Sequence, residues 1–172
     1  MDNDKLISYG IIDTRKSEKN LCYFSQMVSK LIDEYKPDFV AWENLKTNQN
    51  ADTIRLLGEV TGILRYICQH NSIPYAEVVP ISVKAKICQS KGTGKNGRKT
   101  KLDLARWICH IYNLEFPKNK RTGEDIKSES NKFFNITDAI GIAYFCYLTG
   151  LKGESRKSGE KTSKSKKSRV NK

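Results

Sequence analysis

The spacing of apolar residues changes repeatedly along the chain, and each change marks an expected helix or strand. Over residues 18–35, apolar side chains recur every three or four positions, which predicts a helix that ends before Pro37. Residues 38–43 form a short and almost wholly apolar run, typical of a strand that is covered on both faces of a sheet. That run ends in the charged residue Glu43.

The rest of the pattern predicts further strands and helices in alternation. Strands are expected over residues 6–14 and 74–79, and helices over residues 50–69, 80–88, 99–112 and 136–148. Residues 115–132 are polar and mixed in charge, which predicts a long loop. Within residues 50–69, Gly58 and Gly62 are expected to allow close packing against the sheet. Strands that alternate with helices over most of a chain indicate a layered α/β domain.

Composition limits the class of protein without choosing a function. The chain has 172 residues, of which 38% are hydrophobic, so we expect one domain with a buried core. No run approaches the roughly 20 apolar residues that span a bilayer, and the N-terminus has no hydrophobic targeting segment, which favours a soluble intracellular protein. Five scattered cysteines favour reduced core thiols over a disulfide framework or a zinc site. Trp42 and Trp107 lie in apolar segments and are expected in the core.

Positive charge gathers in two places. Lys and Arg number 31 against 19 Asp and Glu, a formal net charge of +12. Residues 152–172 contain too few apolar side chains to fold, so we expect a domain over residues 1–151 and a disordered basic tail, which on its own could be merely solubilising. The second cluster flanks the glycine-rich loop of residues 92–97 and contains no acid: Lys84, Lys86, Lys91, Lys95, Arg98, Lys99 and Lys101. Such a surface attracts the phosphates of a nucleic acid, although the loop lacks the spacing of a P-loop.

Two carboxylates stand at the ends of apolar segments. Glu43 ends a predicted strand and Asp138 opens a predicted helix, and open α/β folds bind ligands where strand ends meet helix N-termini. Each alone has a plain explanation, as an exposed strand-end glutamate or as an aspartate that favours the helix dipole. Together with the basic surface, the pair suggests a Mg²⁺ site for phosphodiester hydrolysis, which normally needs three or four carboxylates.

Four segments follow one another in a specific order, namely KPDFVAWENLKTNQNADTIRLLGEVTG, PYAEVVPISVKAKIC, GRKTKLDLARWI and NITDAIGIAYF. Their order and spacing resemble the RuvC-type Holliday-junction resolvases of the RNase H-like superfamily over residues 6–148. The resemblance implies an RNase H-like mixed sheet flanked by helices and a bacterial or phage cytoplasm. It also implies a homodimer, because two active sites must address two strands of a junction. The helix over residues 50–69 is the expected interface, although its apolar face could equally be ordinary core.

The resemblance also implies roles for individual residues. In this family a strand of the form PDxxxxE supplies a metal-binding glutamate, here Glu43, and a later DxxDA or HxxDA motif aligns with Asn135 and Asp138. All three are therefore expected metal ligands, for Mg²⁺ or for Mn²⁺ as its substitute. Lys84 and Lys101 match lysines that contact the junction, and Lys101 could stabilise charge that develops at the scissile phosphate.

Two departures from the family pattern leave the activity open. The family begins with a GxDPG strand whose aspartate bridges two metal ions, and nothing before Leu6 matches it, so the chain is expected to start at the family's third strand. Asp13 aligns with the end of that strand and is a weak substitute. Asn135 offers an amide oxygen, which binds Mg²⁺ more weakly than a carboxylate does. Either the protein continues upstream, or another acid substitutes, or the chain binds DNA without cutting it.

These observations favour a Mg²⁺-dependent endonuclease that acts on four-way or branched DNA junctions, with Glu43, Asp138 and Lys101 as its catalytic residues. A catalytically incomplete junction-binding protein on the same fold is the main alternative, and it predicts salt-sensitive binding without nicking. A different RNase H-like nuclease, acting on RNA–DNA hybrids or in transposition, is a third hypothesis, because one fold can serve several substrates.

Overall fold

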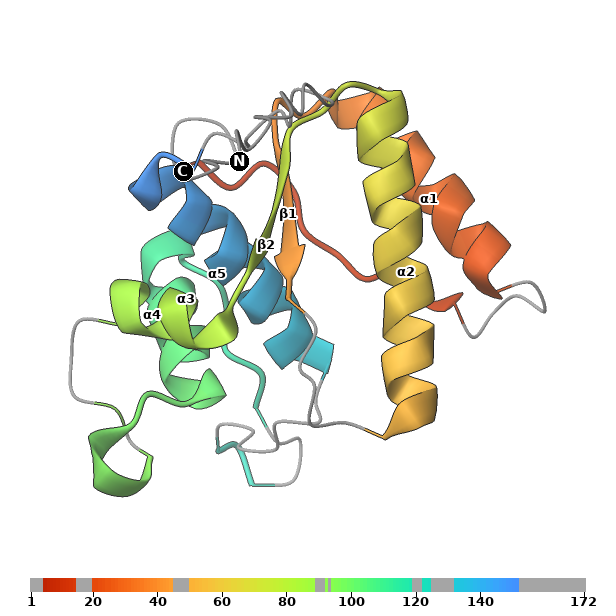
Figure 1. Ribbon diagram of the computed structural model, residues 1–172. Coiled ribbons are helices and arrows are strands. Elements are labelled where there is room, and N and C mark those ends of the chain that lie inside the picture. Colours follow the sequence, from red (N-terminus) through yellow and green to blue (C-terminus); the bar gives the residue numbers. More distant parts are fainter. Residues whose placement is uncertain are drawn as a thin grey trace, which may run out of the picture.

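The computed structural model describes residues 5–14, 20–44, 50–88, 92, 94–118, 122–124 and 132–151. Its elements in chain order are α1 (Asn20–Tyr35), β1 (Val40–Glu43), α2 (Ala51–His70), β2 (Tyr75–Val78), α3 (Pro80–Ile87), the 3₁₀ turn η2 (Lys95–Gly97), α4 (Lys101–Tyr112) and α5 (Lys132–Thr149). In Figure 1 the strands lie in the middle, with α1 and α2 to their right and α3 and α4 to their left. α5 runs from below the end of β1 to the upper left of the view. This is the layered α/β arrangement that the alternating pattern predicts. No helix in this part of the chain is long and apolar enough to cross a membrane.

β1 and β2 form a parallel pair, which is the whole of the sheet within the described residues. Val40 lies opposite Tyr75 and Glu43 lies opposite Val78, so both strands end at the same edge. α2 connects the two strands and begins after Asn50, whose side-chain oxygen accepts a hydrogen bond from a backbone N–H in the first turn at 2.8 Å. The apolar run of β1 predicts a strand that is buried on both faces. In the structure its first three residues are only half-buried, and Glu43 is exposed.

The buried core lies between β2 and the helices α3, α4 and α5. Its members come from each of these elements and are nearly inaccessible to water: Val78, Val83, Ile87, Cys88, Leu104, Ile108, Ile140, Ile142 and Cys146. α5 also packs along β1. Because burial of apolar surface is the dominant favourable term in folding, this flank holds the three helices rigidly against the sheet.

α1 and α2 pack on each other on the opposite side of the strands (Figure 1). Arg65 of α2 donates hydrogen bonds from two guanidinium nitrogens to Glu77 Oε1 of β2, which joins this helix to the sheet. The expected packing of Gly58 and Gly62 against the sheet is wrong, because a Cβ at either position would have no neighbour within 4 Å. The face of α2 that turns inward is instead the one that carries larger buried residues such as Ile67.

One predicted strand and the predicted start of one helix also differ from the structure. Residues 6–14 form no strand, and Ile7 and Tyr9 are exposed, because a high β-propensity gives no strand without a partner to pair with. α5 begins at Lys132 rather than at residue 136, because the fully buried Phe134 extends its apolar face. Asp138 therefore lies in the second turn of α5 and does not open the helix.

The cysteines and tryptophans occupy mostly the predicted environments. All five cysteines are free, and four are buried, whereas Cys22 is exposed on α1. Trp107 packs against the core, with its ring centroid 5.6 Å from that of Tyr144. Trp42 is half-buried and stacks on Tyr75 at 5.1 Å. Of the predicted loop, residues 115–118 and 122–124 are described and contain no helix, and the predicted basic tail lies outside the described residues.

Candidate active site

Two carboxylates and one lysine line a small cleft at the carboxyl edge of the sheet. Glu43 comes from the end of β1, Lys84 from α3 and Asp138 from α5. The remaining lining is apolar: Pro80, Val83, Leu104 and Ile142. The cavity volume is about 10 Å³, room for about one water molecule. The fold thus brings together the two carboxylates that the sequence pattern singles out.

Strand pairing sets the position of Glu43. The next residue, Asn44, donates its backbone N–H to Val78 O at 2.9 Å, which holds the end of β1 in the parallel register. Side chains alternate between the faces of a strand, so the neighbouring Trp42 stacks on Tyr75 while Glu43 lines the cleft.

A close approach of two helices sets the position of Asp138. A Cβ on Gly141 would lie 3.1 Å from Leu104 Cδ2, so the glycine lets α5 lie unusually close to α4. Asp138 is three residues before Gly141, and residues so spaced lie on neighbouring positions of a helix surface. Asp138 consequently meets the N-terminus of α4, where Lys101 Nζ lies 2.9 Å from Asp138 Oδ2.

The start of α4 is anchored by a capping box. Asp103 donates its backbone N–H to Thr100 Oγ1 at 3.2 Å, and Thr100 donates its backbone N–H to Asp103 Oδ2 at 2.7 Å. The box holds Lys101, the first residue of α4, in place opposite α5. The Thr-x-x-Asp spacing is a sequence signal for this cap that the predictions above did not include.

The donor atoms of the cleft fit one hard cation better than two. Mg²⁺ is usually held by one or two carboxylates together with water and phosphate oxygens, and Glu43 and Asp138 supply two carboxylates. Over the described ranges, no group of three or more His, Cys, Asp or Glu side chains could hold a metal ion. Asp13 does not line the cleft, and its Oδ2 lies 3.0 Å from Lys132 Nζ at the start of α5. Asn135 is exposed one turn before Asp138 and is not part of the cleft lining.

The glycine-rich loop between α3 and α4 folds back on itself. Gly92 donates its backbone N–H to Gly97 O at 3.1 Å, and Gly94 donates its backbone N–H to Arg98 O at 2.9 Å. A Cβ on Gly92 would lie only 2.2 Å from Arg98 O, which is backbone, so glycine is required there. The glycines thus let the basic segment fold as a tight loop beside the cleft helices.

Six of the seven predicted DNA-contacting cations lie within the described residues. Three of them are exposed: Lys86, Lys95 and Arg98. Lys84 lines the cleft, and Lys101 contacts Asp138 beside it. Lys99 is half-buried and donates to Ala85 O at 3.3 Å, so it also braces the loop against α3. Lys91 lies outside the described residues.

Cys88 follows α3 directly and is buried near these lysines. Burial raises the pKa of its thiol, and the positive charges of Lys99 and Lys84 oppose this rise only in part. The thiol is therefore neutral near pH 7 and is no nucleophile for the cleft.

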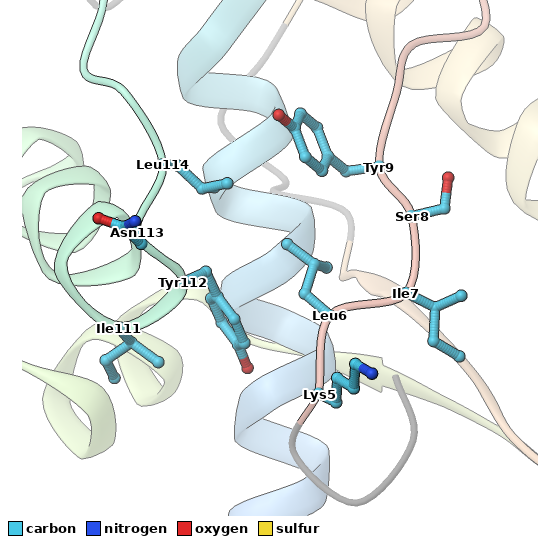
Figure 2. Close-up of a pocket in the computed structure, with 9 residues that line it drawn as sticks. All are labelled: Lys5, Leu6, Ile7, Ser8, Tyr9, Ile111, Tyr112, Asn113 and Leu114. Atoms are coloured by element: carbon cyan, nitrogen blue, oxygen red, sulfur yellow. The ribbon is translucent and has the colours of Figure 1, made fainter.

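A larger groove lies between the N-terminal segment and the end of α4 (Figure 2). Its volume is about 840 Å³, and its lining consists of residues 5–9 and 111–114, none of which is acidic. Figure 2 shows Leu6 and Tyr112 pointing into it and Ile7 pointing away. The lining of the larger groove offers no carboxylate to bind a metal ion, whereas that of the small cleft offers two, so the small cleft is the candidate active site.

Comparison with known proteins gives this cleft a family context. The family model described as "Crossover junction endodeoxyribonuclease RuvC" matches residues 2–120, well over half of the chain. The chain belongs to the RuvC family. The matched residues include Glu43, Lys84 and Lys101, and they end before α5, which carries Asp138.

Individual RuvC proteins are similar over most of the chain. The crossover junction endodeoxyribonuclease RuvC of Caldicellulosiruptor saccharolyticus is 33% identical over 148 residues, which cover 84% of this chain and 76% of that protein. The RuvC of Finegoldia magna is 29% identical over 156 residues, which cover 88% and 83%. The structure of Thermus thermophilus RuvC in complex with a Holliday junction substrate is similar with a TM-score of 0.57 and 14% identity, over 83% of this chain and 77% of that one. These likenesses confirm the RNase H-like α/β class and the resemblance to RuvC-type resolvases.

Proposed function

We propose that this chain is a structure-selective endonuclease that cuts four-way or branched DNA junctions with the help of Mg²⁺. RuvC proteins are metal-dependent nucleases, and the choice of Mg²⁺, with Mn²⁺ as its substitute, follows from the carboxylate donors of the cleft. One observation carries the proposal, namely that Glu43, Asp138 and Lys84 line the same cleft.

Each cleft residue has a distinct part in this proposal. Glu43 and Asp138 would hold the ion. Asn135, which is exposed in the preceding turn of α5, would have to turn its amide towards the cleft to act as a weaker ligand. When bound, such an ion lowers the pKa of a water molecule and polarises a phosphodiester. Lys84 would orient the phosphate in the cleft, and Lys101 would oppose the negative charge that develops there.

The exposed cations of α3 and the glycine-rich loop would hold the DNA backbone outside the cleft. Contacts of this kind position a duplex without reading its sequence, and they weaken steeply as salt rises. The exposed positions of Lys86, Lys95 and Arg98 support this role, and Lys99 would extend the same surface. A DNA contact by Lys91, which lies outside the described residues, stays a prediction. This chemistry would take place in the cytoplasm of a bacterium or of a phage-infected cell, where such junctions arise.

A homodimer is part of the same proposal. Gly58 and Gly62 lie on an exposed face of α2. The exposed apolar residues Ile54 and Tyr66 lie one turn away on the same face, and a second copy of α2 could approach closely there. Sedimentation velocity of the full chain would test this, with Gly58→Arg as the variant that blocks the approach. A monomer at tens of micromolar for the unaltered chain would contradict the dimer.

The limited number of acids favours a second candidate, a junction-binding protein that does not cut. Two carboxylates can hold one metal ion more readily than a pair of metal ions, and two-metal hydrolysis requires the pair. Its expected signature is salt-sensitive junction binding that persists in Mg²⁺ without a nicked product.

The decisive experiment is cleavage of an end-labelled four-way junction by the full chain in Mg²⁺ or Mn²⁺, beside a linear duplex of the same sequence. We expect junction-specific nicking that falls at least about 100-fold in Glu43→Gln and in Asp138→Asn, because each loses a charged ligand. Glu34→Gln is the matched control, since Glu34 is an exposed acid of α1. Binding without nicking would select the second candidate, and a chain that binds duplex and junction equally would overturn both.

A further inference from the structure

The ion pair between Lys101 and Asp138 places a cation of the protein on one of the two proposed metal ligands. We infer that the Lys101 ammonium is a displaceable counterion, which occupies Asp138 until a DNA phosphate takes it away and leaves the carboxylate to the metal ion. Metal and DNA would then bind cooperatively. The inference rests on the proposed function, because it assumes that Asp138 binds metal and that Lys101 contacts DNA.

The geometry of the pair supports displacement rather than a permanent lock. Lys101 Nζ lies 2.9 Å from Asp138 Oδ2, while the two side chains remain 32% and 20% exposed. The contact is therefore shielded from water more than an ordinary surface pair, yet an incoming phosphate can still reach it. The capping box fixes only the backbone of Lys101, and the four-carbon stem lets its ammonium swing from the carboxylate to a phosphate.

Electrostatics makes the ammonium and a divalent ion compete. Two cations on one carboxylate repel each other strongly at a separation of a few Å, so the metal binds Asp138 well only after the ammonium has left. In the absence of both ligands, Lys101 also offsets the repulsion between Asp138 and Glu43, which line the same cleft.

A phosphate at the N-terminus of α4 would be an alternative partner for the ammonium. Lys101 is the first residue of that helix, where the helix dipole favours a phosphate, and the exposed cations of the loop lie just before it in the chain. Metal binding alone and DNA binding alone must each break the ion pair, whereas together they break it once. Because the ion pair is broken only once, each ligand binds more tightly when the other is present. Metal ion and DNA must raise each other's affinity by the same factor.

A second ion pair on α5 is more exposed and lies outside the cleft. Lys132, at the start of α5, lies 3.0 Å from Asp13 but is 57% exposed, and neither residue lines the cleft. It holds the N-terminal segment to the helix, and nothing beside it requires a metal ion.

Metal affinity in the absence of DNA tests the inference directly. The free Mn²⁺ signal in electron paramagnetic resonance would be titrated with the full chain and with Lys101→Met, which keeps the length of the side chain. We expect Lys101→Met to bind Mn²⁺ about threefold to tenfold more tightly than the unaltered chain. Lys30→Met, which removes one exposed charge from α1, is the matched control and should leave the affinity unchanged. Circular dichroism and thermal melting would show that each variant is folded.

Junction affinity supplies the second measurement. Fluorescence anisotropy with a labelled junction, with and without Ca²⁺ at constant ionic strength and without cleavage on a gel, gives the coupling between ion and DNA. Ca²⁺ should improve junction affinity about threefold to tenfold more in the unaltered chain than in Lys101→Met. Equal coupling in both proteins, or Mn²⁺ affinity in Lys101→Met no tighter than in Lys30→Met, would overturn the inference.

A third variant separates this failure from failure of the proposed function. Asp138→Asn should weaken Mn²⁺ binding at least about tenfold, because it removes a charged ligand. If Asp138→Asn binds Mn²⁺ as the unaltered chain does, the proposed metal site is wrong and the inference fails with it. If Asp138→Asn loses the metal while Lys101→Met behaves like the control, only the inference is wrong.

Discussion

The two flanks of the sheet differ in how deeply they bury apolar side chains. On the flank of α3, α4 and α5, residues such as Leu104 and Ile108 are sealed from water. The flank of α1 and α2 buries fewer apolar side chains, and Leu31, Ile54 and Leu56 there are 39–52% exposed. The flank of α3, α4 and α5 also exposes some apolar residues, such as Ile81, but it contains most of the buried ones. Asp138, Lys84 and Lys101 all belong to this more deeply buried flank.

This difference shows which flank can hold metal-binding side chains in a fixed geometry. Carboxylates that share a metal ion must be held in one geometry, and side chains are held best by close-packed surroundings. The exposed apolar surface of α1 and α2 contributes less to the monomer and remains open to a partner, as the proposed dimer requires. Four predictions test this contrast.

The largest expected effect comes from truncating an isoleucine on each flank. Ile108 of α4 is 0% exposed and Ile54 of α2 is 39% exposed. Ile108→Ala should lower the free energy of unfolding by about 2–5 kcal/mol, because it removes buried surface and leaves a cavity. Ile54→Ala should lower it by less than about 1 kcal/mol. Chemical denaturation measures both, and similar losses would show that the flanks do not differ.

Adding a methyl group to a helical glycine on each flank should give opposite results. Gly58→Ala should raise the free energy of unfolding by about 0.5–1 kcal/mol, because its Cβ meets open space and alanine favours helix. Gly141→Ala should lower it by about 1–3 kcal/mol, since its Cβ would press on the buried Leu104 at 3.1 Å. Thermal and urea unfolding of the two variants compares them, and stabilisation by Gly141→Ala would mean that α4 and α5 are less tightly packed than described.

The ion pair that joins the N-terminal segment to α5 should matter little. Asp13→Asn should change the free energy of unfolding by less than about 1 kcal/mol, because its partner Lys132 is 57% exposed and remains accessible to water. Junction nicking should stay within about twofold of the unaltered chain, since Asp13 does not line the cleft. A loss comparable to that of Asp138→Asn would make Asp13 the third metal ligand.

The smallest effect concerns buried thiols on both flanks. Burial raises the pKa of Cys68 on α2, of Cys88 after α3 and of Cys146 on α5 above the ordinary value of 9.0. A raised folded-state pKa means that this contribution to stability is fully present below about pH 9 and is lost as the pH rises towards the folded-state values. The free energy of unfolding should therefore fall between pH 9 and 10.5, by less in Cys146→Ala than in the unaltered chain. Equal slopes in the two proteins would contradict a buried, neutral Cys146.

Much of the fold could be predicted from local pattern. Within the described residues, the apolar spacing located the five α-helices and the two strands to within a few residues, because amphipathic periodicity reflects which side of an element is buried. It failed for residues 6–14, since apolar, β-branched composition does not reveal whether a strand has a partner. It also failed for the face of α2 that carries Gly58, because spacing shows which residues share a face but not which face turns inward.

The order of motifs in the sequence was enough to predict the family, and it singled out Glu43 and Asp138 as candidate ligands. Motif order reflects local chemistry, and the family match over residues 2–120 confirms the resemblance that those motifs imply. Folding of the whole chain was needed to show that Glu43 and Asp138 line one cleft and that Lys101 contacts Asp138. The contact of Lys101 with Asp138 depends on how closely α5 approaches α4. That approach is set by packing at Gly141 and Leu104, residues far apart in the chain whose meeting leaves no mark in local spacing.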